Sequence, residues 1–197
     1  MISLLEIPAV YRLFAAAIGG KFRDRYVAEY VQPRAGDRIL DIGCGPGDIL
    51  RHLPDVRYLG VDMDARYIAA ARKRFGNLGE FRCESATETV LREPASFDLV
   101  MANGVLHHLD DTEVSKVLTL ARSALKPTGR LVAHDGAFLA EQSAIEALLL
   151  KMDRGRFVRT PDQYVRLARL AFEHVESVVR RGLLRSPYTH HIMTCRA

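Results

Sequence analysis

The sequence predicts an α/β protein built on a doubly wound, mostly parallel sheet with helices on both faces. Short apolar segments of strand length alternate with segments of helical periodicity through the middle of the chain. Within the segment 39–48, three glycines at alternate positions (Gly43, Gly45 and Gly47) follow the first strand and precede a helix-like stretch, and Asp62 ends the next strand. Such a loop and acid indicate a nucleoside-containing cofactor at the carboxyl ends of parallel strands.

Length and composition exclude several other classes of protein. The 197 residues suffice for one domain with a sizeable core, and 48% hydrophobic with 26% charged residues is typical of globular proteins. The net charge of +4 comes with dispersed arginines, so we expect no nucleic-acid partner. The three cysteines lack metal-ligand spacing, which predicts no metal site and a reducing cytoplasm. We expect no signal peptide and no transmembrane segment, since no apolar run approaches about eighteen residues.

The N-terminal part, from Pro8 to about Val31, has helical spacing of apolar residues and is interrupted at Gly19-Gly20. After it, short apolar segments predict five strands, over 38–42, 57–62, 80–84, 97–102 and 130–134. Helical periodicity predicts helices over 48–53, 65–75, 112–125, 143–152 and 161–172.

Local signals support the bounds of these elements. Gly76 to Gly79 stops the helix over 65–75, and the segment 126–129, Lys-Pro-Thr-Gly, stops the helix over 112–125. Thr160-Pro161-Asp162-Gln163 reads as a capping box with proline at the first helical position. The segments 174–180 and 190–196 fit a final antiparallel pair of strands.

The glycine loop narrows the class of cofactor. A dinucleotide fingerprint requires glycine at the position of Asp48, whereas here the third glycine, Gly47, comes one residue earlier. Asp41 places a carboxylate just ahead of the loop, which disfavours a pyrophosphate and suits an ammonium or sulfonium group. An NAD-dependent dehydrogenase is therefore disfavoured.

At this point the sequence resembles the class I S-adenosylmethionine-dependent methyltransferases of small molecules. Their first motif, an acid followed by x-Gly-x-Gly-x-Gly, is matched by Asp41, Gly43, Gly45 and Gly47, and their second, an acid ending strand two, by Asp62. The resemblance covers about 38–135 and, more weakly, the C-terminal strand pair. It implies a Rossmann-like seven-stranded sheet with an antiparallel C-terminal strand, and S-adenosyl-L-methionine as cofactor with S-adenosyl-L-homocysteine as product.

The resemblance also assigns cofactor-binding residues. It implies that Asp41 and the glycine loop hold the methionine end, that Asp62 binds the ribose hydroxyls and that Met63 lies against the adenine. After strand three the family carries an acid and a small residue, where this sequence has Glu84-Ser85-Ala86, so either Ser85 occupies the acid's place or Glu84 has taken its role. The expected cofactor-binding residues are Asp41, Gly43, Cys44, Gly45, Asp62, Met63, Ser85, Ala86 and Asn103.

Catalytic and acceptor-binding candidates come from the expected carboxyl edge of the sheet and from two flanking regions. His107 is the leading candidate for a general base, because histidine titrates near neutral pH. His134 and Asp135, at the end of the predicted strand 130–134, are the next candidates. Gly104-Val105 follows Asn103, where amino-methylating nucleic-acid enzymes place two prolines and an aromatic residue, which argues against DNA amine methylation. Acceptor-side candidates are Tyr11, Arg154 and Arg156.

These observations predict one methyltransferase domain over 1–197. Within it we expect an N-terminal helical lid (1–32), a cofactor-binding core (33–135), a substrate-side helical insert (136–172) and the strand pair (173–197). The insert carries four cations over 151–159, which suit an anionic acceptor or form a solvated loop. The predicted reaction is methyl transfer to a small molecule or glycan precursor, at oxygen. Two alternatives stay open: a non-catalytic S-adenosylmethionine-binding sensor or scaffold, and a quinone-pathway methyltransferase at a membrane surface.

Overall fold

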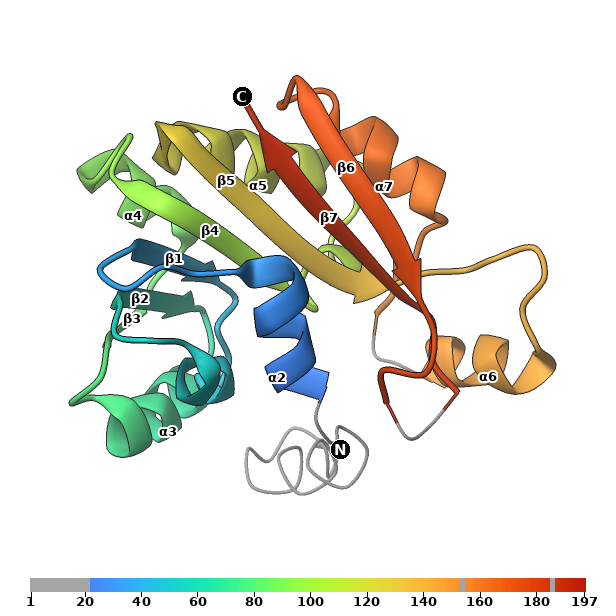
Figure 1. Ribbon diagram of the computed structural model, residues 1–197, viewed down its shortest axis with the longest axis horizontal. Helices are drawn as coiled ribbons and strands as arrows, with labels where there is room; N and C mark the ends of the chain where they lie inside the picture. Colours follow the sequence, from blue (N-terminus) through green and yellow to red (C-terminus); the bar gives the residue numbers. More distant parts are fainter. Residues whose placement is uncertain (1–21, 153–154, 185–186) are drawn as a thin grey trace.

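A seven-stranded sheet forms the centre of the protein in a computed structural model that describes residues 22–152, 155–184 and 187–197 (Figure 1). The strand order is β3-β2-β1-β4-β5-β7-β6, and β7 runs antiparallel to both of its neighbours. The strands are β1 (Arg38–Ile42), β2 (Arg57–Asp62), β3 (Glu80–Cys83), β4 (Phe97–Asn103), β5 (Leu125–Gly136), β6 (His174–Arg180) and β7 (His190–Arg196). This confirms the predicted fold class.

Helices cover both faces of the sheet (Figure 1). Those described are α2 (Phe22–Tyr26), α3 (Ala65–Phe75), α4 (Ala86–Arg92), α5 (Asp111–Ala124), α6 (Ala144–Met152) and α7 (Pro161–Ala168), with short turns η2 (Val27–Val31), η3 (Asp48–His52) and η4 (Leu106–His108). Residues of α2, η2 and α3 bury apolar side chains on one face, and residues of α4, α5 and α7 do so on the other. Among the described residues, no helix combines the length and apolarity needed to cross a membrane.

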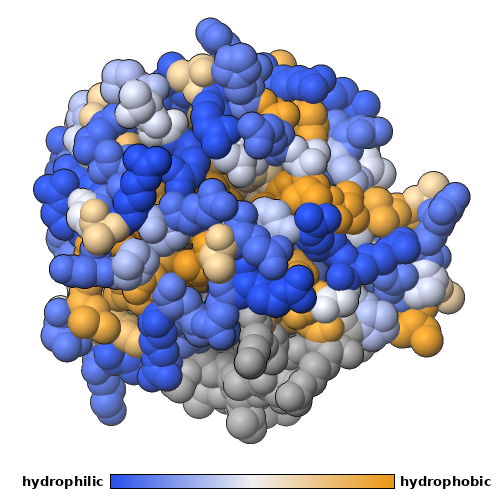
Figure 2. Space-filling model, in the orientation of Figure 1, coloured by the Kyte–Doolittle hydropathy of each residue, from blue (hydrophilic) through white to orange (hydrophobic). Residues whose placement is uncertain are grey.

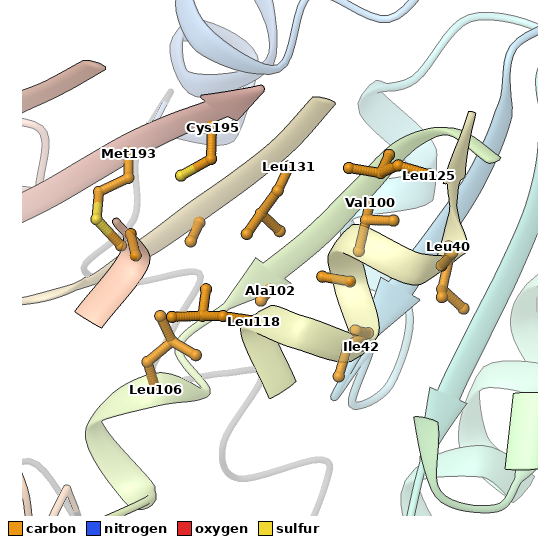
Figure 3. Packing of buried hydrophobic residues seen from close by; sticks show 14 of the residues in the cluster. Leu40, Ile42, Val100, Ala102, Leu106, Leu118, Leu125, Leu131, Met193 and Cys195 are labelled. Carbon is orange, nitrogen blue, oxygen red and sulfur yellow. The ribbon is translucent and has the colours of Figure 1, made fainter. Parts of the chain in front are cut away.

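Apolar side chains that alternate along the strands fill both layers. On the α5 face, Leu40, Ile42, Val100 and Ala102 pack with the α5 residue Leu118 (Figure 3). The same cluster extends through β5 to β7, where Met193 and Cys195 belong to it (Figure 3). Hydrophilic residues cover most of the face seen in Figure 2, with hydrophobic patches between them. Because the middle strands are buried on both faces, the polar groups that matter for function lie where these strands end.

Some predicted bounds were wrong. The third strand ends at Cys83, because Ser85 caps α4 in a capping box with Glu88, and we did not predict this helix. The segment 126–129, expected as a turn, belongs to β5, where the pairing with β4 shifts register between Phe97 and Leu99. The helix expected to reach residue 172 ends at Ala168. Most of the predicted N-terminal helical segment, including Gly19-Gly20, lies outside the described residues.

Candidate functional site

The glycine loop between β1 and η3 adopts a backbone that only glycine accepts easily. Gly43, Gly45 and Gly47 have φ angles of 67°, 53° and 72°, in the left-handed region. A Cβ on Gly43 would lie 2.6 Å from the Val105 side chain, and one on Gly47 would lie 2.8 Å from Phe81. At Gly45 a Cβ would meet nothing within 4 Å, so the loop backbone there faces open space. A ligand can therefore approach the main chain at this point.

Asp62 at the end of β2 anchors that loop. Its Oδ2 accepts a hydrogen bond from the Gly45 N–H at 2.9 Å, and its Oδ1 accepts one from the Asp64 N–H at 2.8 Å. Asp64, and not Asp62, is the N-cap of α3, because its Oδ1 accepts from the Arg66 N–H. The Asp62 carboxylate is partly exposed beside Met63, whose exposure is 74%. This places an acid and an apolar side chain together at the edge where the resemblance implies ribose and adenine.

Asp41 on β1 has a buried carboxyl group, and only one of its two oxygens accepts a hydrogen bond from another described residue. The Tyr58 hydroxyl donates to Oδ2 at 2.6 Å, whereas Oδ1 has no hydrogen-bond partner among the described residues. Burial raises the pKa of Asp41 to about 7, and the hydrogen bond from Tyr58 partly opposes this shift. A buried oxygen without a partner costs free energy unless a ligand satisfies it, and an ammonium group would do so.

Asn103 ends β4, the strand that pairs with β1. Its Oδ1 accepts a hydrogen bond from the Tyr26 hydroxyl at 2.5 Å, while its buried Nδ2 has no partner among the described residues. Neighbouring strands thus present an unsatisfied acceptor, Asp41 Oδ1, and an unsatisfied donor, Asn103 Nδ2. These match the ammonium and carboxylate of an amino-acid tail, so the residues present fit the methionine end of S-adenosylmethionine.

The other expected cofactor residues have partners within the protein. Ser85 caps α4 through its hydroxyl, Ala86 begins that helix and packs against the core, and Glu84 binds Thr89. Their side chains therefore help to start α4, and their backbone stays beside the end of β3. The Cys44 thiol packs inside the turn, 2.8 Å from where a Cβ on Gly60 would lie, and burial raises its pKa so that it stays neutral.

His107 and Asp135, predicted separately, form one buried pair. Asp135 Oδ1 lies 2.7 Å from His107 Nδ1 and accepts a second hydrogen bond from the His107 backbone N–H at 3.1 Å. Burial raises the pKa of Asp135, and the contact with His107 opposes that rise. With its Nδ1–H directed at the carboxylate, the imidazole has Nε2 as its basic nitrogen. The pair has the chemistry of a general base with an orienting acid.

His134 does not join this pair, because successive strand residues point to opposite faces of the sheet. Its Nε2 lies 2.7 Å from Nδ1 of His190, and its ring contacts those of Phe22 and Tyr26. Burial lowers the pKa of His134 well below its usual value, so the imidazole is neutral. It lies on the α2 side of the site, next to Asn103 on the neighbouring strand.

The segment that follows α6 returns over the His107 loop. A Cβ on Gly155 would lie 2.1 Å from the His107 ring, and the Phe157 N–H donates to the His107 carbonyl at 2.9 Å. Arg159 is only 6% exposed and donates to the carbonyls of Leu106, Leu109 and Phe157 and to the Asp111 carboxylate. Arg159 is one of the four cations for which we expected either an anionic acceptor or a solvated loop, and it fits neither expectation, because its guanidinium donors hold this loop in place.

Of the three acceptor-side candidates, the structure describes only Arg156. Arg156 is exposed, while Tyr11 and Arg154 lie outside the described part of the chain. The sequence reasoning did not identify Tyr26 or Tyr58, whose hydroxyls bind Asn103 and Asp41. A signal was available for Tyr58, since a tyrosine in a buried strand needs a polar partner for its hydroxyl.

Comparison with known proteins agrees with this site. Residues 39–129 match the family model of a methyltransferase domain. The 27-O-demethylrifamycin SV methyltransferase of Amycolatopsis mediterranei is 33% identical over 122 residues, covering 58% of this chain and 44% of that protein. The ubiquinone biosynthesis O-methyltransferase of Nitrobacter winogradskyi is 32% identical over 147 residues, covering 67% and 54%. The chain spans about half the length of the curated relatives it matches.

Solved structures share the fold at low sequence identity. The phosphoethanolamine N-methyltransferase 2 of Haemonchus contortus superposes with a TM-score of 0.76 at 17% identity, covering 98% of this chain and 58% of that one. Human N-acetylserotonin methyltransferase gives a TM-score of 0.72 at 17% identity, covering 98% and 56%. Residues 39–129 therefore form a methyltransferase domain, and the glycine loop, the strand-end acids and the sheet order support its place among the class I S-adenosylmethionine-dependent methyltransferases.

Proposed function

We propose that the protein transfers a methyl group from S-adenosylmethionine to an oxygen of a small molecule or glycan precursor. One observation supports it most: Asp41 Oδ1 and Asn103 Nδ2 are buried near the ends of adjacent strands, beside a glycine loop open at Gly45, and neither atom has a hydrogen-bond partner within the described part of the chain. This set complements a charged amino-acid tail. S-adenosylmethionine supplies a methyl group on a sulfonium, so the enzyme gains mostly by holding donor and acceptor aligned.

In this proposal the cofactor lies across β1, β2 and β4. Asp41 binds the ammonium group, the Gly43–Gly45 backbone lies along the methionine end, and Asp62 accepts hydrogen bonds from the ribose hydroxyls. Met63 covers the adenine, with the backbone at Ser85 and Ala86 on its other side. Asp62 can take this role while it holds the Gly45 N–H, because each carboxylate oxygen accepts more than one hydrogen bond.

We assign the proton transfer to the His107–Asp135 pair. His107 Nε2 takes the proton of the acceptor hydroxyl while the acceptor oxygen gains the methyl group and the sulfonium sulfur keeps the electron pair of the broken C–S bond. Asp135 holds the Nδ1–H tautomer and stabilises the imidazolium that forms. Among the relatives, the rifamycin and ubiquinone enzymes are named as acting at oxygen, which supports an oxygen acceptor.

The remaining assignments stay proposals. Residues 1–32 would close over the acceptor, residues 136–172 would line it, and Tyr11, Arg154 and Arg156 would contact it if it is anionic. The exposed Arg156 is consistent with an anionic acceptor. The three cysteines are free thiols, consistent with a reducing cytoplasm.

Calorimetry with S-adenosylhomocysteine tests the cofactor site. We expect the wild type to bind it, Asp62→Ala to lose most of the affinity, and Asp64→Ala to retain it, since that carboxylate faces Arg66. Incubation with labelled S-adenosylmethionine and fractions of native cell extract then tests for turnover and yields the product. His107→Asn should lose turnover while keeping cofactor affinity. Binding without turnover on any fraction would favour the sensor, and absence of binding would refute the proposal.

A further inference from the structure

Tyr26 connects the N-terminal helical segment to the cofactor site through one hydrogen bond. The residue lies 77 positions before Asn103, is only 1% exposed, and donates its hydroxyl proton to Asn103 Oδ1 at 2.5 Å. Among the described side chains of α2 and η2, no other forms a hydrogen bond with the strand ends that carry the glycine loop and Asn103. The contact therefore joins an element outside the core sheet to the end of β4.

The direction of this hydrogen bond determines which end of the Asn103 amide faces the site. Burial, together with the nearby Asp41 and Asp135 carboxyls, raises the pKa of Tyr26 well above its usual value. The phenol therefore keeps its proton, and the hydrogen bond runs from the Tyr26 hydroxyl to the amide oxygen of Asn103. With Oδ1 turned toward Tyr26, Nδ2 must point the other way, where it is buried and has no partner among the described residues.

Neighbouring rings hold the Tyr26 phenol in place. Its ring stacks between Phe22, at 5.7 Å between centroids, and Tyr30, at 6.2 Å. His134 contacts it at 5.3 Å with tilted planes. Such packing restricts the ring, so the hydroxyl is a donor of fixed position.

We propose that Tyr26 is a positioning residue that orients the Asn103 amide so that Nδ2 donates to an oxygen of the cofactor's methionine end. The inference rests on the function proposed above. Without the phenol hydroxyl, the amide can rotate by half a turn about its last side-chain bond. It would then present Oδ1 to the ligand oxygen, which replaces an attraction by a repulsion between two acceptors.

The test uses S-adenosylhomocysteine, which requires no knowledge of the acceptor. Tyr26→Phe keeps the ring and its stacking and removes only the hydroxyl, so we expect its dissociation constant to rise about 10-fold. The matched control is Tyr30→Phe, because that tyrosine stacks on Tyr26 but its hydroxyl accepts a hydrogen bond from Arg180. Tyr30→Phe should bind S-adenosylhomocysteine as the wild type does.

A double-mutant cycle separates positioning from a general structural role. Asn103→Ala alone should weaken binding at least as much as Tyr26→Phe, and adding Tyr26→Phe to Asn103→Ala should change the dissociation constant by less than about 2-fold. Additive effects would show that Tyr26 acts independently of Asn103 and would overturn the inference. Equal affinity of Tyr26→Phe and wild type would do the same while leaving the proposed function intact. A wild type that does not bind S-adenosylhomocysteine would refute the proposed function itself.

Discussion

We predict that the protonation state of Asp41 makes the affinity for S-adenosylhomocysteine depend on pH. An ammonium group binds the ionised carboxylate, whereas the free protein holds this carboxyl with a pKa of about 7. Lowering the pH through 7 protonates Asp41, so the cofactor must displace a proton in order to bind. Below pH 7 the amino group of the ligand itself stays protonated, and its charge does not change.

The size of the effect follows from that pKa. At pH 8 most Asp41 is ionised, at pH 6 about one tenth is, and at pH 5 about one hundredth. The dissociation constant for S-adenosylhomocysteine should therefore rise about 10-fold per pH unit below 7, and roughly 100-fold between pH 8 and pH 5. Tyr58→Phe should move the onset to higher pH, because the hydrogen bond it removes favours the ionised form.

Calorimetric titrations at several pH values, at constant ionic strength, measure both affinity and proton release. At pH 6 we expect nearly one proton released per ligand bound. Asp41→Asn should bind weakly with no such slope, while Asp98→Asn, which removes a carboxylate paired with Lys126, should keep it. A flat affinity for the wild type, or the same slope in Asp41→Asn, would show that Asp41 does not meet the ammonium group.

Three further predictions concern stability, each measured by denaturant unfolding of the free protein. Gly47→Ala should lower the free energy of unfolding by about 2–4 kcal/mol, because it combines left-handed backbone strain with overlap against Phe81. Gly36→Ala, at a φ of 83° with open space around it, should lower it by about 1 kcal/mol. Equal losses would contradict the clash with Phe81. Arg159→Met should lower the free energy of unfolding by about 2–4 kcal/mol, because it leaves buried carbonyls without a donor. Substitution of the exposed Arg156 by Met should lower it by less than about 0.5 kcal/mol. The folded-state pKa of Asp41 is raised, so the stabilisation that comes from its bound proton is lost as the pH rises from about 4 to 7. Relative to Asp41→Asn, the free energy of unfolding of the wild type should fall by roughly 1 kcal/mol per pH unit in this range. A constant difference between the two proteins would refute the raised pKa.

The local sequence was sufficient to predict the sheet, the glycine loop and the strand-end acids. Strand and helix periodicities are short-range, and a left-handed turn leaves a record in the glycines themselves. The bounds of β1, β2, β6 and β7 were predicted as observed. The helix α4 was missed because its start depends on the reciprocal capping of Ser85 and Glu88, which overrides the strand-like residues before it.

Only the tertiary structure determined which polar groups meet. His107 and Asp135 are 28 positions apart, and Tyr26 and Asn103 are 77 apart, so no local pattern records either hydrogen bond. The same holds for Arg159, which in sequence is one of several cations and in the structure is a buried support for the His107 loop. Burial sets the protonation of Asp41, and burial depends on how distant segments pack against each other. The residue types of the site could therefore be predicted from sequence, whereas their pairing and charge could not.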